Sequence, residues 1–261
     1  MKGVILAAGK GSRLNGTAGD KPKCLVEAGG ITLLDRQIRT LEQAGVDDIV
    51  VVVGCQAGRV REACGAGVTY VENARFSETN SLYSLWTARA LLSEGFVVLN
   101  CDVLFHPGLL DDLLATHRDA ALLIDYRKPE DPAFGEEEMK VKVRSGLVVD
   151  ISKTMPADEA DGENLGIVKF GPKSAPHLVS ILDRVVAEGG LREWAPRAFR
   201  DFAQDRPLHA IGSGGHPWIE IDFPKDYRRA VRDILPAIDG ARAHGPAPAA
   251  AARIPRGGRG L

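Results

Sequence analysis

Residues 6–14 read Leu6-Ala7-Ala8-Gly9-Lys10-Gly11-Ser12-Arg13-Leu14, and Lys21-Pro22-Lys23 follows shortly after. The apolar run Lys2–Ala7 leads into this stretch and predicts a buried parallel strand. Gly9 and Gly11 have no Cβ, so the backbone around them can turn its N–H groups toward phosphate oxygens. Three cations stand close to this turn: Arg13, Lys21 and Lys23. A strand, a glycine turn and nearby positive charge together predict a triphosphate-binding site.

The spacing of this stretch excludes two other phosphate-binding loops. A P-loop needs Lys-Ser/Thr after its second glycine, but the spacing from Gly11 leads to Gly16-Thr17 with no lysine between them. A dinucleotide-binding fingerprint needs a third glycine at the place that Leu14 occupies. The alternative that stays open is a plain surface turn between a strand and a helix.

The composition is that of a globular α/β chain. A length of 261 residues with 44% apolar residues is enough for one large domain with its own core. The net charge of −2 gives no argument for nucleic-acid binding. The four cysteines have no C-x-x-C spacing, so they predict free thiols in a reducing cytoplasm rather than a zinc site. No apolar stretch is long enough to span a membrane or to act as a signal peptide. The sequence leaves open whether two copies form a homodimer.

Strand and helix patterns alternate after the glycine turn. Helical spacing covers residues 31–44 and 81–92, whereas short apolar runs at 48–53, 68–71 and 96–100 predict buried strands. This alternation predicts an α/β fold: a doubly wound, mostly parallel sheet with helices on both faces. Later patterns predict strands at 120–125, 208–211 and 218–222 and helices at 107–116, 176–187, 191–202 and 225–234.

Two regions differ from this pattern. Residues 127–138 are charged and contain proline, and the alternating runs 139–143 and 147–151 predict a β-hairpin around Ser145-Gly146. We therefore expect an acceptor-binding insertion or lid at about residues 126–165 within a single domain, residues 1–239. Residues 240–261 contain mainly Ala, Pro, Gly and Arg, and this composition predicts a disordered basic tail.

Two aspartates follow predicted strands. Asp102 stands at the carboxyl end of strand 96–100, where ligands bind in open α/β sheets. A carboxylate there is costly unless a cation or a metal pairs with it. Period-2 alternation places Trp218, Glu220 and Asp222 on one face of the strand 218–222. The alternative for both aspartates is that each caps the helix that follows it.

Residues 6–14 together with Pro22-Lys23-Cys24-Leu25 resemble the signature of the nucleotidyltransferases that activate sugar phosphates and small phospho-alcohols. Segments 78–85 and 137–143 resemble the cytidylyl-transferring branch, which acts on phosphocholine and phosphonates, and Trp-x-Glu-Ile-Asp at 218–222 resembles a third signature of the family. The resemblance spans residues 6–222 and implies a Rossmann-like nucleotide-diphospho-sugar transferase fold. Cys101 stands where glycine is commoner in the family, a departure that concerns packing more than chemistry.

The resemblance also implies roles for individual residues. Lys23 and Arg13 would be catalytic, and Asp102 and Asp222 would hold Mg²⁺. The nucleotide would contact Leu6, Ala7, Ala8, Gly9, Gly11, Ser12, Asn80 and Ser81. The acceptor would contact Glu163, Lys140, Trp218 and Glu220. Asn80 can instead cap a helix, and exposed Glu/Lys clusters around residue 140 can simply be solvated.

The expected reaction is Mg²⁺-dependent transfer of CMP from CTP to a small phosphonate or phosphomonoester, similar to 2-aminoethylphosphonate or phosphocholine, with release of pyrophosphate. Acids outnumber aromatics in the candidate acceptor region, which favours an aminated acceptor over phosphocholine, since quaternary ammonium groups prefer aromatic cages. A sugar-1-phosphate nucleotidyltransferase using another nucleotide is one alternative, against which Thr79-Asn80-Ser81 argues. A non-catalytic homologue is another, against which the presence of Lys23, Asp102 and Asp222 argues.

Overall fold

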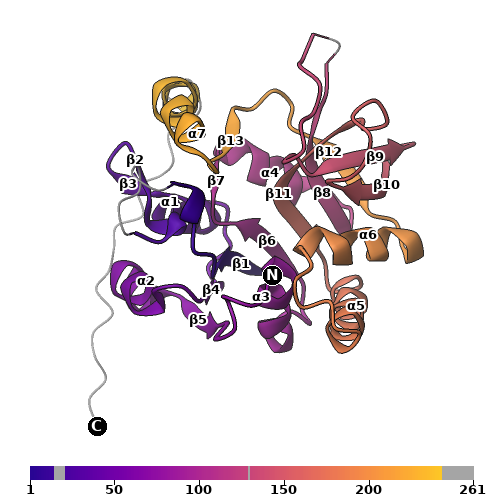
Figure 1. Ribbon diagram of the computed structural model, residues 1–261, viewed down its shortest axis with the longest axis horizontal. Helices are drawn as coiled ribbons and strands as arrows, with labels where there is room; N and C mark the ends of the chain where they lie inside the picture. The colour runs from indigo at the N-terminus through magenta and orange to yellow at the C-terminus, as the bar shows by residue number, and fades with distance from the viewer. Residues whose placement is uncertain (15–20, 129, 243–261) are drawn as a thin grey trace.

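The computed structural model describes residues 1–14, 21–128 and 130–242. A nine-stranded mixed sheet runs through its centre, and helices cover both faces of the sheet (Figure 1). The strands, in spatial order, are β5 (Thr69–Glu72), β4 (Ile49–Val53), β1 (Lys2–Ala7), β6 (Phe96–Asn100), β11 (Gly162–Phe170), β8 (Ala120–Tyr126), β12 (His209–Gly212), β10 (Leu147–Ser152) and β9 (Lys140–Arg144). This architecture confirms the predicted α/β class.

The half of the sheet from β5 to β6 is parallel and buried on both faces. Alternate side chains of β1 enter two separate cores, Val4 and Leu6 on one face and Ile5 and Ala7 on the other. Burial on both faces explains why these strands are continuous apolar runs in the sequence. The helices on the Ile5 face are α1 (Leu33–Gln43), α2 (Ala57–Cys64) and α4 (Pro107–Ala115), and those on the Val4 face are α3 (Ser81–Thr87), α5 (Ala175–Ala187) and α6 (Ala195–Asp205).

The other half of the sheet is mixed rather than mostly parallel. Strand β11 runs antiparallel to both β6 and β8, whereas β12 is parallel to β8. The predicted hairpin is present as β9 and β10, and it pairs with β12 at Leu147 and with β11 at Gly162 and Glu163. These pairings close five strands on themselves, so the hairpin is built into the sheet.

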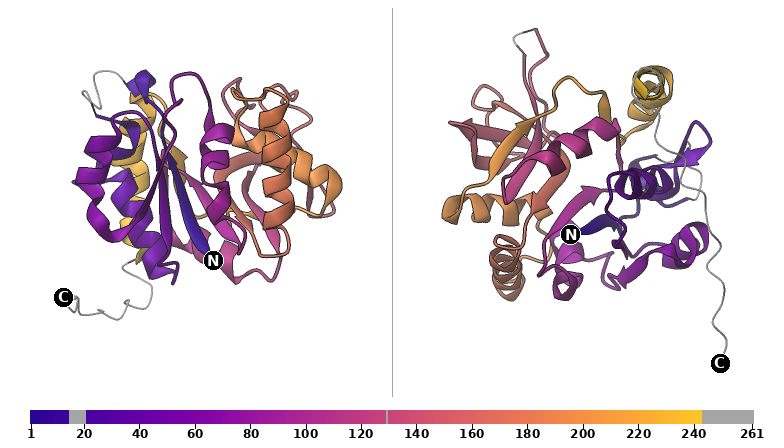
Figure 2. Two further views of the ribbon diagram at one scale, coloured as in Figure 1. Left: turned by 90° about the horizontal axis from the view of Figure 1, so that it is seen from below. Right: turned by 180° about the vertical axis from the view of Figure 1, so that it is seen from behind.

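The C-terminal part packs against the N-terminal segment that carries Lys23. Strand β13 (Trp218–Glu220) pairs with β7 (Val103–Phe105), a short strand that the sequence analysis did not predict. Helix α7 (Pro224–Arg229), a π-helical turn (Ala230–Ile234) and α8 (Leu235–Arg242) follow. They lie beside the hairpin of β2 (Glu27–Ala28) and β3 (Ile31–Thr32), where the Tyr227 hydroxyl donates to the Glu27 carbonyl over 3.0 Å (Figures 1 and 2). A small third core joins these elements.

Two predicted boundaries fall differently in the structure. The helix expected at 191–202 begins at Ala195, because Trp194 has extended backbone angles. Helix α8 includes Gly240 to Arg242, the first residues of the predicted tail, and the rest of that tail lies outside the described residues. Single 3-10 turns occupy Ser12–Leu14, Lys23–Leu25, Gly65–Gly67 and Arg89–Leu91. Within the described ranges, no helix combines the length and the apolar character needed to cross a bilayer.

Candidate active site

A cavity of about 270 Å³ opens at the carboxyl ends of β1 and β6. It brings together side chains and backbone from the glycine turn, from the start of α3, from the end of β6 and from β13. The predicted site residues that line it are Leu6, Ala8, Gly9, Gly11, Arg13, Lys23, Asn80, Ser81, Asp102, Glu220 and Asp222. Segments far apart in the sequence therefore converge at the sheet edge that the strand pattern indicated.

The glycine turn packs directly on the segment that carries Lys23. Gly11 has a φ of +63°, and a Cβ at this position would lie 2.6 Å from the Cβ of Lys23. A side chain at Gly11 would therefore face both backbone strain and a steric clash. The side chain of Ala7 is buried in the core, so this residue offers only its backbone. Ser12 belongs to the 3-10 turn that follows, and its side chain lies outside the described residues.

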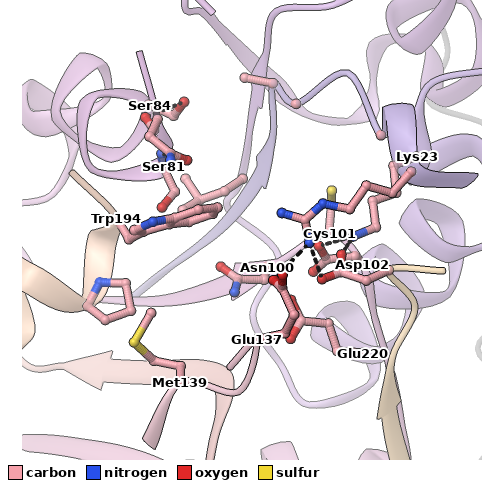
Figure 3. Close-up of a pocket in the computed structure, with 18 of the residues that line it drawn as sticks. Lys23, Ser81, Ser84, Asn100, Cys101, Asp102, Glu137, Met139, Trp194 and Glu220 are labelled. Atoms are coloured by element: carbon pink, nitrogen blue, oxygen red, sulfur yellow. Dashed lines mark hydrogen bonds and ion pairs between the residues drawn. The ribbon is translucent and has the colours of Figure 1, made fainter. Parts of the chain in front are cut away.

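The ammonium of Lys23 lies between Asp102 and Asp222. Its Nζ donates to Asp102 Oδ2 over 2.6 Å and also donates to Asp222 Oδ1. Burial alone would lower the pKa of Lys23, but the two aspartate charges outweigh it and raise the pKa above its ordinary value. Lys23 is therefore fully charged at neutral pH. Figure 3 shows Lys23 next to Asp102 at one end of the cavity.

Three carboxylates converge at this end of the cavity. Asp102, Glu220 and Asp222 each place one oxygen within 4.8 Å of the others. The second oxygen of Asp102, Oδ1, is buried and has no hydrogen-bond partner among the described residues. Burial, with the charges of Asp102 and Asp222, raises the pKa of Glu220 to about 8. Converging carboxylate oxygens with an unsatisfied acceptor are a donor set suited to a hard divalent cation.

The local backbone explains how these carboxylates meet. The Ile221 N–H donates to the Asp102 carbonyl over 3.0 Å, next to the pairing of β7 with β13. Other residues cap the neighbouring helices: the His106 side chain caps α4, and the Asp226 carboxylate accepts from the backbone at the start of α7. The side chains of Asp102 and Asp222 therefore point into the cavity rather than capping a helix.

The opposite end of the cavity is formed by α3 and by the segment before α6. The Asn80 side chain accepts from the Ser81 N–H over 2.8 Å, so Asn80 caps α3 while it also lines the cavity. The Ser81 hydroxyl accepts from the Ala195 N–H over 2.8 Å and so fixes the position of Trp194. Figure 3 shows Trp194 beside Ser81 at this end, with Asn100 between it and the charged end.

Three of the four predicted acceptor-binding residues lie outside the lining of the cavity. Trp218 donates from Nε1 to Asp125 over 3.1 Å, and Lys140 is buried and donates to the Lys153 carbonyl over 2.6 Å. Burial, followed by the charges of Glu138 and Asp125, raises the pKa of Glu163 to about 7. Among those four predicted residues, only Glu220 faces the cavity directly.

Several lining residues were not predicted from the sequence. They are Phe76, Thr79, Ser84, Asn100, Cys101, Glu137, Met139, Lys153, Asn164, Trp194 and Pro196. Asn100 is the last residue of β6, two positions before Asp102, and this place at the carboxyl end of the strand was the one available signal. Trp194 falls within the helix that the sequence predicted, so it was not expected at the cavity. Lys153 follows a hairpin strand, and no sequence pattern there indicates a binding residue.

Charged side chains alternate in sign along one wall of the cavity. Arg13 donates to Asp222 Oδ2 over 3.2 Å and to Glu137 Oε2 over 3.1 Å. Lys153 donates to the same Glu137 oxygen over 3.3 Å. With the pairs that Lys23 makes, this forms a continuous chain of ion pairs across the cavity. Positive charge is thus held in place beside the three carboxylates Asp102, Glu220 and Asp222.

The chain matches one protein-family description and is similar in sequence to several known proteins. The MobA-like NTP transferase domain matches residues 3–242. The bifunctional IPC transferase and DIPP synthase of Rubrobacter xylanophilus is 32% identical over 239 residues, which are 89% of this chain and 51% of that protein. The choline-phosphate cytidylyltransferase of Streptococcus pneumoniae is 27% identical over 240 residues, which are 90% of this chain and 98% of that protein. The CMP-5'-(3-aminopropyl)phosphonate synthase of Streptomyces rubellomurinus is 37% identical over 253 residues, 88% of this chain and 38% of that protein.

Solved structures show the same fold. The CTP:phosphocholine cytidylyltransferase from Streptococcus pneumoniae superposes with a TM-score of 0.73 at 27% identity and covers 88% of this chain and 97% of that one. The inositol-1-phosphate CTP transferase from T. maritima superposes with a TM-score of 0.74 at 23% identity, covering 91% and 96%. The predicted nucleotide-diphospho-sugar transferase fold is confirmed.

Proposed function

Since this chain belongs to the MobA-like NTP transferase family and is a nucleotidyltransferase, we propose that it transfers CMP from CTP to a small phosphonate or phosphomonoester and releases pyrophosphate, with Mg²⁺ as its metal. The observation that carries this proposal is the ammonium of Lys23, held between Asp102 and Asp222 beside the glycine turn. A fixed cation next to a carboxylate set is what two reacting phosphate groups require.

Asp102 and Asp222 would hold the metal, with Glu220 as the third carboxylate of the set. Mg²⁺ bound there would offset the repulsion between the α-phosphate of CTP and the incoming anion. The orphaned Oδ1 of Asp102 fits this role, because a hard cation takes carboxylate oxygens as ligands. With a cation on the carboxylates, Lys23 would exchange its bonds to Asp102 and Asp222 for bonds to substrate oxygens.

Lys23 would donate to the α-phosphoryl oxygens, where negative charge builds up in the in-line transition state. The backbone amides of the glycine turn and the Arg13 guanidinium would hold the β- and γ-phosphates, which leave as pyrophosphate. The acceptor oxygen is already anionic at neutral pH, so no side chain has to act as general base. Catalysis then consists of positioning and electrostatic stabilisation.

The choice of CTP and of a small acceptor is supported by the relatives. Among proteins similar to this chain are a choline-phosphate cytidylyltransferase, a CTP:phosphoglutamine cytidylyltransferase and a CMP-5'-(3-aminopropyl)phosphonate synthase. Each name gives a cytidylyl group, CTP or CMP together with a short phosphorus-containing acceptor. Asn80 and Ser81, next to Trp194, lie at the end of the cavity where we place the cytosine and its ribose.

A substrate panel tests this proposal. The chain is incubated with Mg²⁺, with CTP, UTP, dTTP or GTP, and with phosphocholine, 2-aminoethylphosphonate, an inositol phosphate or glucose 1-phosphate, and pyrophosphate is measured. We expect the highest kcat/KM with CTP and a small phosphonate or phosphomonoester. A preference for glucose 1-phosphate with another nucleotide would assign the chain to the sugar-activating nucleotidyltransferases instead.

A further inference from the structure

The side chain of one buried glutamine holds both ends of the turn that carries Asp102. Gln37 lies in the middle of α1 and is 2% exposed. Its Nε2 donates to the Asn100 carbonyl over 2.8 Å and to the Val103 carbonyl over 2.9 Å. Asn100 is the last residue of β6 and Val103 is the first of β7, so Asp102 lies between the two acceptors. Both N–H groups of the amide are therefore used on this single turn.

The two carbonyl acceptors fix which way the amide of Gln37 faces. The amide nitrogen carries two donors, whereas the amide oxygen can only accept and would repel both carbonyls. That oxygen, Oε1, is buried and has no hydrogen-bond partner among the described residues. A buried acceptor without a partner lowers stability, and an apolar side chain of the same length would avoid this cost. The contribution of Gln37 therefore lies in its two donors rather than in packing.

The turn held by Gln37 is also connected to the strand that brings the other two carboxylates. Its Asp102 carbonyl accepts from the Ile221 N–H over 3.0 Å, and Val103 pairs with Glu220 in the ladder of β7 and β13. Ile221 lies between two residues of the carboxylate set, Glu220 and Asp222. A displacement of the turn relative to α1 would therefore change how all three carboxylates face one another.

Helix α1 also supports the segment that carries Lys23. Leu34, one helical turn before Gln37, belongs to the same buried core as Cys24, the residue that follows Lys23. One helix thus packs under the lysine and, through its glutamine, holds the turn of Asp102. The position of the Asp102 carboxylate relative to the Lys23 ammonium then depends on the two hydrogen bonds that Gln37 donates.

We propose that Gln37 is a positioning residue for the reaction: its amide holds the turn 100–103 so that the Asp102 carboxylate faces Lys23 and the other two carboxylates. Gln37 does not line the cavity, so it acts through Asp102 and not on substrate. The inference rests on the proposed function, in which Asp102 is a metal ligand. A change at Gln37 should therefore affect metal binding and turnover and should spare the nucleotide contacts at the opposite end of the cavity.

Two substitutions of similar volume test this role. Gln37→Met keeps the length of the side chain and removes both donors. We expect the affinity for Mn²⁺, measured by electron paramagnetic resonance without substrate, to fall about tenfold, as is typical when a residue that orients a metal ligand is lost. The kcat with CTP should fall by a similar factor, while the KM for CTP changes little. Gln37→Glu offers at most one donor, so it should also lose affinity for Mn²⁺, at least about threefold.

Two variants on the same helix serve as matched controls. Gln43→Met removes an exposed amide from α1. Thr40→Val removes a buried hydroxyl, which donates to the Arg36 carbonyl over 2.8 Å within the helix. Neither contact reaches the turn, so both variants should keep the wild-type affinity for Mn²⁺ and the wild-type kcat. Urea unfolding of all four variants shows whether a loss of metal affinity merely follows a loss of stability.

A measurement on the wild-type chain needs no variant to fold. The side-chain N–H groups of Gln37 are buried and bonded, so their NMR signals should exchange slowly with solvent, and Mg²⁺ should shift them. The exposed amide of Gln43 should exchange fast and should not respond to Mg²⁺.

Three results would overturn the proposal. The first is a wild-type affinity for Mn²⁺ and a wild-type kcat in Gln37→Met. The second is an equal loss of affinity in Gln37→Met and Thr40→Val, which would reduce the effect to the stability of α1. The third is fast exchange of the Gln37 amide, or signals that Mg²⁺ leaves unmoved. If the wild-type chain binds Mn²⁺, and Gln37→Met weakens this binding, but no nucleotide is transferred, the proposed function fails while the role of Gln37 stands.

Discussion

Lys23 and Asp222 are separated by 199 positions in the chain, yet they form an ion pair at the part-buried end of the cavity. The pairing of β13 with β7 brings Asp222 to this point, and the turn around Gly11 supports Lys23. Asp222 and Asp102 thus stabilise the cation that we expect to act on the α-phosphate. The two carboxylates and the lysine thus lie together at one end of the cavity.

Replacing Lys23 should lower turnover more than nucleotide affinity. Lys23→Met removes the charge where negative charge develops, and losing such a contact costs on the order of 3 kcal/mol in the barrier, about a hundredfold in kcat. Lys21→Met is the matched control, because Lys21 pairs with Glu27 and does not line the cavity. Steady-state kinetics with CTP measure both variants. Near-normal kcat in Lys23→Met would remove this residue from the mechanism.

Replacing either aspartate of the carboxylate set should weaken metal binding. Asp102→Asn and Asp222→Asn each remove a charged ligand, so the affinity for Mn²⁺, measured by electron paramagnetic resonance without substrate, should fall at least about tenfold. The Mg²⁺ concentration for half-maximal activity should rise in parallel. Asp111→Asn, on the exposed face of α4, serves as the control. An unchanged Mn²⁺ affinity in either variant would mean that this aspartate is no ligand.

The raised pKa of Glu163 predicts a pH-dependent stability. The pKa of this partly buried carboxyl is about 7 in the folded chain against 4.5 ordinarily. Between these values the folded chain binds more protons than the unfolded chain, so the free energy of unfolding falls as the pH rises, by on the order of 3 kcal/mol in full. Glu163→Gln cannot ionise and should escape this loss.

Urea unfolding at about pH 5 and about pH 8 measures this effect. Relative to wild type, Glu163→Gln should gain stability at the higher pH. Glu159→Gln, at an exposed carboxylate that pairs with Lys142, should follow the wild-type pH dependence. An identical pH dependence in Glu163→Gln and wild type would show that Glu163 ionises freely in the folded chain.

Substitutions at Gly11 and Gly30 distinguish the stability cost of backbone strain from that of a steric clash. Both have positive φ, +63° and +75°, but a Cβ at Gly30 meets nothing within 4 Å, whereas one at Gly11 collides with Lys23. Gly30→Ala should cost about 1 kcal/mol of stability through the backbone alone. Gly11→Ala should cost more and should also lower kcat, since it displaces Lys23. Equal losses of stability with normal kcat in both variants would contradict the packing described here.

The sequence predicted those parts of the molecule that depend on local patterns. The buried strand Lys2–Ala7 and the glycine turn could be identified because continuous apolar runs and paired glycines have few alternative structures. Asp102 could be placed because the carboxyl end of a parallel strand is a known site for ligands. Its meeting with Asp222 then followed from the fold of the family that the motifs resemble.

Features that depend on long-range contacts could not be predicted. Glu137 and Arg13 form an ion pair although 124 positions separate them in the chain, and no sequence periodicity predicts such a contact. Lys140 was expected at the acceptor, but pairing of β9 in the closed part of the sheet turns its side chain inward to the Lys153 carbonyl. Trp194 lines the cavity only because Ser81 binds the backbone of Ala195 and sets the start of α6.

The central claim is that this chain joins the CMP moiety of CTP to a small phosphorus-containing acceptor. The most direct measurement is ³¹P NMR of the wild-type chain with Mg²⁺, CTP and 2-aminoethylphosphonate or phosphocholine. We predict that the acceptor signal shifts to that of a mixed anhydride while pyrophosphate accumulates in equal amount, and that Lys23→Met shows neither change on the same time scale. Unchanged acceptor signals with CTP, together with conversion of glucose 1-phosphate by UTP or dTTP, would contradict the account.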